Sequence, residues 1–338
     1  MPIDVDFTIP FPPKRPPDAA AAEEHAVQWL SSHGLLQSPE QKQYFISMRV
    51  GAAAAFLYPH STGADLHMAA DTIALTALIN DQVDSSSNQR AQHATEICND
   101  LVTLLQQNRP ARPVTAIGSA WCTLWPRLAD GMSMAWQERA RRHLSQFFSA
   151  YMAPRTMLTA TRYLERRRIL SGLMTWLDLA ERTSHFELPE RALNTALISD
   201  LFEETVKLFN LPHDVFAVER EEARGEVDNM VLVLEHATGR PRPRVIAEIQ
   251  SMVDNAGERF LELESHLPEI GTALALGPSD RTALASYVQA MRDIVRGNYD
   301  WHKQGTARYD PKAADLAIAS GYEDTRLPHR APDPPDAV

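Results

Sequence analysis

The sequence predicts an all-α protein, with the helices of one domain packed around a central space. Apolar residues recur at helical spacing along almost the whole chain, which is the strongest observation for this fold class. Convincing alternation of apolar and polar residues, which would predict strands, is absent, and the run VLVL at 231–234 lies within a helical pattern. The 338 residues show neither an internal repeat nor a shift in composition that would divide them.

The composition restricts the partners that the protein can bind. A net charge of −11 argues against nucleic acid as the main partner, because phosphate binding needs a basic surface. No apolar run has the length of a membrane span, and the first residues lack the pattern of a signal peptide. We therefore expect a cytoplasmic protein without a stable membrane anchor. Cys98 and Cys122 are too few for a disulfide framework.

Proline clusters mark both ends of the chain. We expect an extended N-terminal segment or covering at 1–20, one folded domain at 21–325 and an extended tail at 326–338. Helical patterns are clearest at 43–58, 196–210, 226–237 and 245–267. Loops are expected at 106–114 and 238–244. Pro212 predicts a kink or a new helix start, because proline lacks a backbone donor.

Two carboxylates end a nearly apolar helical stretch at 69–80. A buried charge must be paired, neutralised or bound to a metal. Asp81 and Asp84 are three residues apart, so on a helix both can reach one ion, and hard oxygen ligands of this kind suit Mg²⁺. The alternative for so short a motif is a helix end with two solvated aspartates.

Three later segments carry further polar residues. Asp214 and Glu221 are seven apart, about one helical face, although alone they would indicate a solvated surface. Arg168 precedes Gly172 by four residues, and a glycine within a helical pattern is unfavourable enough to need a structural reason. The alternative places Arg168 on a solvated face, as one of three adjacent arginines. Near the end of the helical signal lie Trp301, Arg308 and Tyr309.

In this order the segments resemble those of class I terpene synthases of the microbial type, from residue 29 to residue 310. The family's aspartate-rich motif is matched by Asn80, Asp81 and Asp84. Its diphosphate-sensing arginine and helix-break glycine are similar to Arg168 and Gly172. Its terminal RY pair is similar to Arg308 and Tyr309, with Trp301 upstream. The frame of its second metal motif and the following helix is matched at Asp214, Arg220, Glu221, Arg224, Gly225 and Asn229.

The sequence also departs from the family's motifs. Asn80 stands where the first motif usually has aspartate. The usual ligands of the second motif fall on His213, Ala217 and Glu221, and an alanine cannot coordinate an ion. A neutral imidazole is also a poorer partner for Mg²⁺ than an amide oxygen. Asp214, next to His213, is the expected substitute ligand.

The resemblance implies a class I terpene synthase bundle around an active-site cavity. It implies Mg²⁺-dependent ionisation and cyclisation of a prenyl diphosphate, with farnesyl diphosphate the expected substrate and a sesquiterpene the expected product. Up to three Mg²⁺ ions are expected, with Mn²⁺ as a substitute, in a monomer or homodimer. The alternatives are a prenyltransferase of the same fold, or a non-catalytic helical protein that binds a prenyl ligand or a partner.

The resemblance also implies three groups of site residues. The metal ligands would be Asp81, Asp84, His213, Asp214 and Glu221. The diphosphate would be bound by Arg168, Arg220, Arg308 and Tyr309. Phe56 and Trp301 are candidates to stabilise a carbocation, together with a backbone carbonyl near Gly172. Core packing is the alternative role for both aromatic residues.

Overall fold

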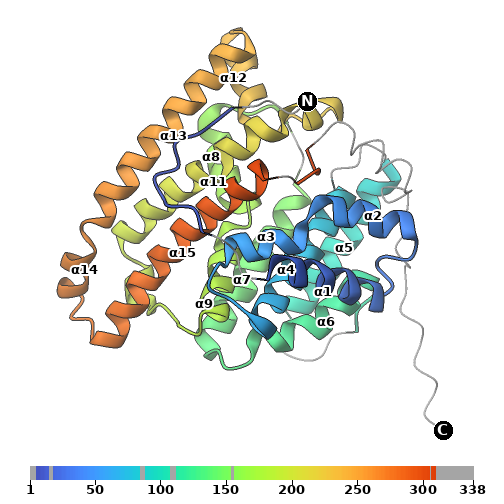
Figure 1. The fold of residues 1–338 in the computed structure, drawn as a ribbon, viewed down its shortest axis with the longest axis horizontal. Coiled ribbons are helices and arrows are strands. Elements are labelled where there is room, and N and C mark those ends of the chain that lie inside the picture. The colour runs from blue at the N-terminus through green and yellow to red at the C-terminus, as the bar shows by residue number, and fades with distance from the viewer. Residues whose placement is uncertain are drawn as a thin grey trace.

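The computed structural model describes residues 5–14, 18–83, 88–106, 112–153, 156–304 and 306–309. Within these ranges the regular structure is helical and no residue belongs to a strand, so the predicted fold class is confirmed (Figure 1). No described helix is both long and apolar enough to cross a membrane. The helices are α1 (Ala19–Ser32), α2 (Pro39–Met48), α3 (Val50–Leu57), α4 (Gly63–Val83), α5 (Asn88–Gln106), α6 (Ala116–Ala129), α7 (Met134–Tyr151), α8 (Ala160–Leu170), α9 (Leu173–Thr183), α10 (Glu190–Leu193), α11 (Ala196–Ala223), α12 (Met230–Thr238), α13 (Arg242–Glu264), α14 (Leu267–Ala273) and α15 (Pro278–Lys303).

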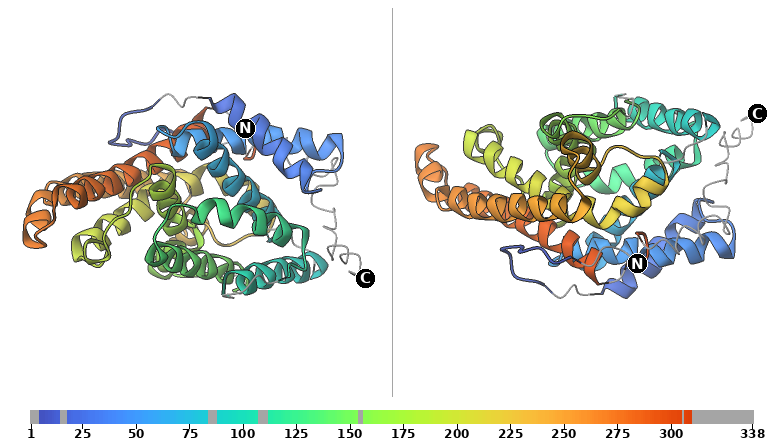
Figure 2. Two further views of the ribbon diagram at one scale, coloured as in Figure 1. Left: turned by 90° about the horizontal axis from the view of Figure 1, so that it is seen from below. Right: turned by 90° about the horizontal axis from the view of Figure 1, so that it is seen from above.

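Long helices surround the centre of the molecule. Helix α11 packs against both α13 and α15, while α3 packs against α15, α4 and α1. Figure 2 shows α1 and α2 at one edge of the bundle and α5 at the opposite edge, in both views. The arrangement leaves α3, α4, α11 and α15 facing a common interior.

The predicted helix at 43–58 is interrupted at Arg49. This residue adopts a left-handed backbone (φ 51°) and ends α2, and α3 begins at the next residue. The Arg49 carbonyl accepts a hydrogen bond from Trp301 Nε1 at 3.0 Å. Nearby, a Cβ on Gly297 would lie 2.1 Å from the Phe56 carbonyl oxygen, so α15 can approach α3 only with glycine there. The break and the glycine together hold the end of α15 against α3.

Helix α11 does not restart at Pro212. The helix is continuous from Ala196 to Ala223, so the predicted new start is wrong. Proline removes one hydrogen bond from the helix. Apolar residues on both sides of Pro212, among them Phe209 and Val215, are buried, and this packing offsets the loss.

Residues 5–14 form an extended covering over α13 and α15. Phe7, Ile9 and Phe11 are buried at alternate positions, and the Phe11 ring contacts the Phe260 ring at 5.0 Å. Lys14 Nζ donates to Asp293 Oδ1 at 2.6 Å, which fixes the end of the covering on α15. The tail expected at 326–338 lies outside the described residues.

Candidate active site

A cavity opens between the helices that face the interior. One part of its wall is apolar and aromatic and the other is polar and charged, and this division suits a ligand with an apolar chain and a charged head. The apolar part includes Phe147, Tyr151, Leu170, Trp176, Phe209 and Trp301. The polar part includes Asn80, Arg167, Asn210, His213, Arg220, Glu221, Glu226, Asp228, Arg308 and Tyr309.

Asp81 lies at the end of α4 next to this cavity, with 1% of its surface exposed. Arg308 binds both of its carboxylate oxygens, Nη2 to Oδ1 at 2.7 Å and Nη1 to Oδ2 at 3.3 Å. Arg220 Nη2 lies 3.4 Å from Oδ1, and the Tyr44 hydroxyl donates to Oδ2 at 3.4 Å. The carboxylate that the sequence placed after an apolar helix is therefore paired with arginines. Asp84 lies outside the described residues.

Burial and charge oppose each other at this ion pair. Burial would lower the pKa of the Arg308 guanidinium, but the Asp81 carboxylate raises it, and the net pKa is well above its usual value. Burial and then the Asp81 charge raise the pKa of Tyr44 to about 12. Tyr44 therefore stays neutral, and its hydroxyl can donate a hydrogen bond to Asp81.

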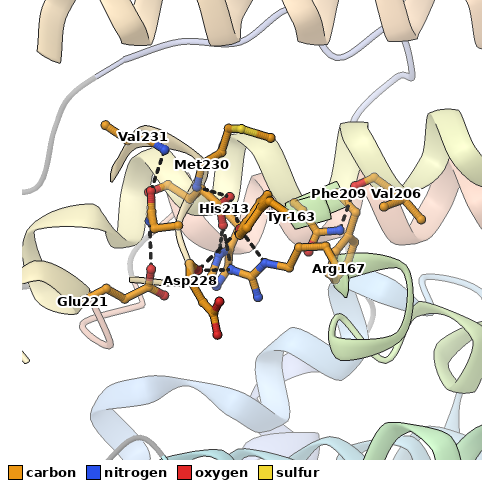
Figure 3. A network of polar contacts seen from close by, with 12 residues as sticks. Tyr163, Arg167, Val206, Phe209, His213, Glu221, Asp228, Met230 and Val231 are labelled. Carbon is orange, nitrogen blue, oxygen red and sulfur yellow. Dashed lines mark hydrogen bonds and ion pairs between the residues drawn. The ribbon is translucent and has the colours of Figure 1, made fainter. Parts of the chain in front are cut away.

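His213 and Glu221 face the cavity from α11, with Ala217 between them (Figure 3 labels the first two). His213 Nε2 and the Tyr309 hydroxyl are 3.1 Å apart. Glu221 Oε2 accepts from Asn229 Nδ2 at 2.8 Å. Burial raises the pKa of Glu221, so its neutral form is favoured more than in water. Ala217 is fully buried and offers only a methyl group.

Asp214, which was expected as a metal ligand, is engaged with protein partners. Its Oδ1 accepts from Arg167 Nη2 at 2.8 Å, and its Oδ2 accepts from the Met230 backbone N–H at 3.1 Å and from the Tyr163 hydroxyl. Figure 3 labels these three partner residues. Although burial opposes it, Arg167 lowers the pKa of Asp214 overall. The carboxylate ties α8, α11 and the start of α12 together and does not line the cavity.

The structure also corrects the choice of arginine on α8. The Arg168 side chain is 46% exposed, and its Nη1 pairs with Glu203 Oε1 at 2.7 Å, away from the cavity. Arg167 lines the cavity, and its Nε donates to the Tyr163 hydroxyl oxygen at 2.6 Å. Adjacent helical residues point about 100° apart, so the sequence located the basic turn but not the inward-facing side chain.

The helical run of α8 and α9 is interrupted at Gly172. Its φ is 69°, and a Cβ there would lie 3.1 Å from the Phe147 ring and 3.2 Å from Trp176. The Gly172 carbonyl accepts from the Trp176 backbone N–H at 3.0 Å, and the Ser171 carbonyl accepts from Trp176 Nε1 at 2.9 Å. The break thus turns the Trp176 ring into the cavity wall.

The two predicted aromatic residues lie in different places. Trp301 lines the cavity. Phe56 is buried in α3 and is not part of the cavity wall, which favours core packing, the alternative role. Phe147, Trp176 and Phe209 were missed, because nothing in their sequence context distinguishes a cavity wall from ordinary core packing.

The end of α4 has the donor chemistry of a divalent-ion site. Asn80 lines the cavity, and the Asp81 carboxylate is a hard oxygen ligand, as Mg²⁺ prefers. An ion there would compete with Arg308 for Asp81. Helix α11 offers an imidazole, a methyl group and one carboxylate, which fit such an ion less well. Among the residues that the structure describes, no three or more His, Cys, Asp or Glu side chains are grouped to hold a metal.

Comparison with known sequences shows that this chain is similar to members of one family. The family model described as terpene synthase family 2, C-terminal metal binding, matches residues 71–259. Pentalenene synthase of Streptomyces arenae is 35% identical over 331 residues, or 95% of this chain and 97% of the relative. A (−)-β-caryophyllene synthase of Saccharothrix espanaensis, which cyclises (2E,6E)-farnesyl diphosphate, is 31% identical, covering 96% of this chain and 94% of its own.

Solved structures agree with the sequence relatives. The crystal structure of an α-eudesmol synthase has a TM-score of 0.81 to this chain at 25% identity, covering 89% of this chain and 99% of the other. A linalool/nerolidol synthase of Streptomyces clavuligerus, in complex with 2-fluorogeranyl diphosphate, has a TM-score of 0.79 at 28% identity. That match covers 89% of this chain and 100% of the other.

Proposed function

This chain belongs to the terpene synthase family, and on that basis we propose that it converts farnesyl diphosphate to a cyclic sesquiterpene with release of diphosphate. The observation that carries the proposal is a cavity with an aromatic wall and one charged end. At the charged end, the guanidinium groups of Arg220 and Arg308 both lie within 3.4 Å of the Asp81 carboxylate. The prenyl chain would lie along the aromatic wall and the diphosphate at the charged end.

Loss of diphosphate is the demanding step. It separates an allylic cation from a leaving group with several negative charges, so positive groups that stabilise the departing oxygens lower the barrier. Arg167, Arg220, Arg308 and Tyr309 are proposed to contact those oxygens, since all four line the cavity. An arginine fork can bind two phosphate oxygens at once, which favours one orientation of the leaving group.

The family's metal-binding region covers 71–259, and the chain uses a divalent metal. We propose Mg²⁺, with Mn²⁺ able to replace it, held by Asn80 and Asp81 at the end of α4 and by Asp84, which comes later in the sequence. When bound, the ion neutralises diphosphate charge and assists its departure. The side chains that hold it also fix where the diphosphate end of the substrate can lie.

The cation formed by ionisation must be kept from water. Phe147, Trp176, Phe209 and Trp301 give the cavity a wall without nucleophiles, and their ring faces attract positive charge. Trp176 is held by its Nε1 hydrogen bond to the Ser171 carbonyl, so its face has a defined orientation. A fixed wall of this kind would bias the folding of the chain before ring closure.

The names of the relatives support a farnesyl substrate. The caryophyllene synthase and a 7-epi-α-eudesmol synthase of Streptomyces viridochromogenes are both described as cyclising farnesyl diphosphate. We also propose a cytoplasmic location and a monomeric or homodimeric state, as expected from the sequence. Loss of the donor at Ala217 is the observation that favours a non-catalytic, prenyl-binding alternative.

Product analysis separates these functions. The protein is incubated with geranyl, farnesyl or geranylgeranyl diphosphate, with and without Mg²⁺, and the extracts are analysed by gas chromatography and mass spectrometry. We expect a cyclic C15 hydrocarbon or alcohol from farnesyl diphosphate, only with Mg²⁺. A longer prenyl diphosphate, formed when isopentenyl diphosphate is added, would indicate a prenyltransferase. Binding of farnesyl diphosphate without any product would indicate the non-catalytic alternative.

A further inference from the structure

Helix α11 carries the positions at which the family resemblance places the second metal site. His213, Ala217 and Glu221 follow one another by four residues, so they lie on one face over two turns. His213 and Glu221 line the cavity. Ala217, with none of its surface exposed, occupies the middle position and has no donor atom.

The neighbouring side chains do not replace the missing donor. Asp214 is fully buried, and both of its oxygens accept hydrogen bonds from protein, including Arg167 Nη2 at 2.8 Å and the Met230 N–H at 3.1 Å. Glu221 Oε2 accepts from Asn229 at 2.8 Å. His213 lies 3.1 Å from Tyr309 through Nε2 and 3.4 Å from Asp214 through Nδ1. Both oxygens of Asp214 are therefore engaged with protein partners, and Glu221 and His213 each have at least one such partner.

Guanidinium groups also lie on this side of the cavity. Arg220 precedes Glu221 and lines the cavity, and its guanidinium lies 5.9 Å from the centre of the Tyr309 ring. Arg308 and Arg167 line the same polar part of the cavity. A divalent ion on α11 would be repelled by these guanidinium groups, and Glu221 is the one carboxylate that α11 itself contributes to the cavity wall. Glu226 and Asp228 line the cavity from the loop that follows α11.

We infer that α11 of this protein holds no divalent ion, and that all divalent ions of the active site are bound at the end of α4 and by the substrate diphosphate. The inference rests on the proposed function, because it concerns how the same site binds diphosphate. In place of an ion, α11 presents the hydrogen-bonding groups of His213 and Arg220 to the leaving group.

Counting bound ions tests the inference. Mn²⁺ bound per chain is measured by electron paramagnetic resonance, with saturating inorganic diphosphate, in the wild type and in Glu221→Gln. The glutamine keeps the size of the side chain and an oxygen that can accept from Asn229, so the fold should persist, which circular dichroism checks. We expect the same number of Mn²⁺ ions in both proteins. Loss of one ion in Glu221→Gln would overturn the inference.

A variant with restored ligands is the matched control. His213→Asn with Ala217→Ser supplies an amide and a hydroxyl oxygen, and we expect it to bind one more Mn²⁺ than the wild type. In that background, Glu221→Gln should remove the added ion. Turnover of farnesyl diphosphate is measured in parallel. If the wild type shows no turnover, that result counts against the proposed function, and the number of bound ions still decides the inference.

Discussion

Arg308 holds the Asp81 carboxylate through two hydrogen bonds, from Nη2 to Oδ1 at 2.7 Å and from Nη1 to Oδ2 at 3.3 Å. The two residues are 227 positions apart, so the pair joins the chain after α15 to the end of α4. Both side chains are at most 4% exposed. A divalent ion and a diphosphate would each take one member of this pair, so we expect their binding to be strongly coupled.

Removing Arg308 should show how much an unpaired buried charge on Asp81 destabilises the folded protein. Arg308→Met leaves Asp81 without its main partner and is expected to lower the free energy of unfolding by about 3 kcal/mol. Adding Asp81→Asn to that variant removes the charge and should recover most of the loss. Urea unfolding of the wild type and the two variants measures both effects. Equal stability of Arg308→Met and the wild type would show that the pair contributes nothing.

The two adjacent arginines of α8 give a matched pair of substitutions. Arg167→Lys keeps the charge but removes the planar fork at the cavity, and we expect kcat/KM to fall about 100-fold. Arg168→Lys changes a side chain that pairs with Glu203 outside the cavity, and near wild-type kinetics are expected. The reverse result would restore Arg168 as the arginine that contacts diphosphate.

Gly172 should be sensitive for two separable reasons. Gly172→Ala places a Cβ in a left-handed backbone and 3.1 Å from the Phe147 ring, with an expected cost of about 2 kcal/mol. Gly239 has a similar φ of 64°, but a Cβ there meets nothing within 4 Å. Gly239→Ala should therefore cost about 1 kcal/mol, from the backbone alone. Equal losses in thermal unfolding would mean that the Phe147 contact relaxes freely.

The sequence was sufficient for the fold class because helical periodicity repeats along the chain. It also located the functional segments, since Asp81, Glu221, Arg308 and Tyr309 meet at or beside one cavity. Their order along the chain matches a known family, and that family assignment is confirmed. The local sequence pattern was therefore enough to identify the segments that meet at the site.

The direction of individual side chains was harder to predict. Arg167 and Arg168 have the same charge and are adjacent in the sequence, and only the rotation of α8 against the bundle decides which faces inward. Asp214 was expected to bind a metal. Its actual partners, the Tyr163 hydroxyl and the Met230 backbone, come from other helices and leave no signal in the local sequence. The wall residue Trp176 depends similarly on the break at 171–172, a tertiary feature.

A half-buried glutamate should make stability depend on pH. Burial raises the pKa of Glu23 from its usual 4.5 to about 7 in the folded protein. The folded state thus keeps a proton that the unfolded state releases, so this stabilisation is complete below pH 4.5 and is lost as pH rises to 7. Glu23→Gln should raise the free energy of unfolding by about 2 kcal/mol at pH 8 and change it little at pH 4.

The exposed neighbour Glu24 supplies the control for this effect. Glu24→Gln removes one negative charge from the same helix without changing a buried group, so the pH profile should follow that of the wild type. Urea unfolding between pH 4 and pH 8 compares the three proteins. A Glu23→Gln profile parallel to that of the wild type would place the Glu23 pKa near its usual value.

The most direct test of the account is to measure diphosphate release and terpene formation together. Purified protein is given farnesyl diphosphate and Mg²⁺, with excess chelator in a parallel sample, and both products are quantified over time. We expect one diphosphate for each cyclic C15 product, with both absent in chelator and restored by added Mg²⁺. Full product formation in chelator, or no C15 product with Mg²⁺ present, would contradict it.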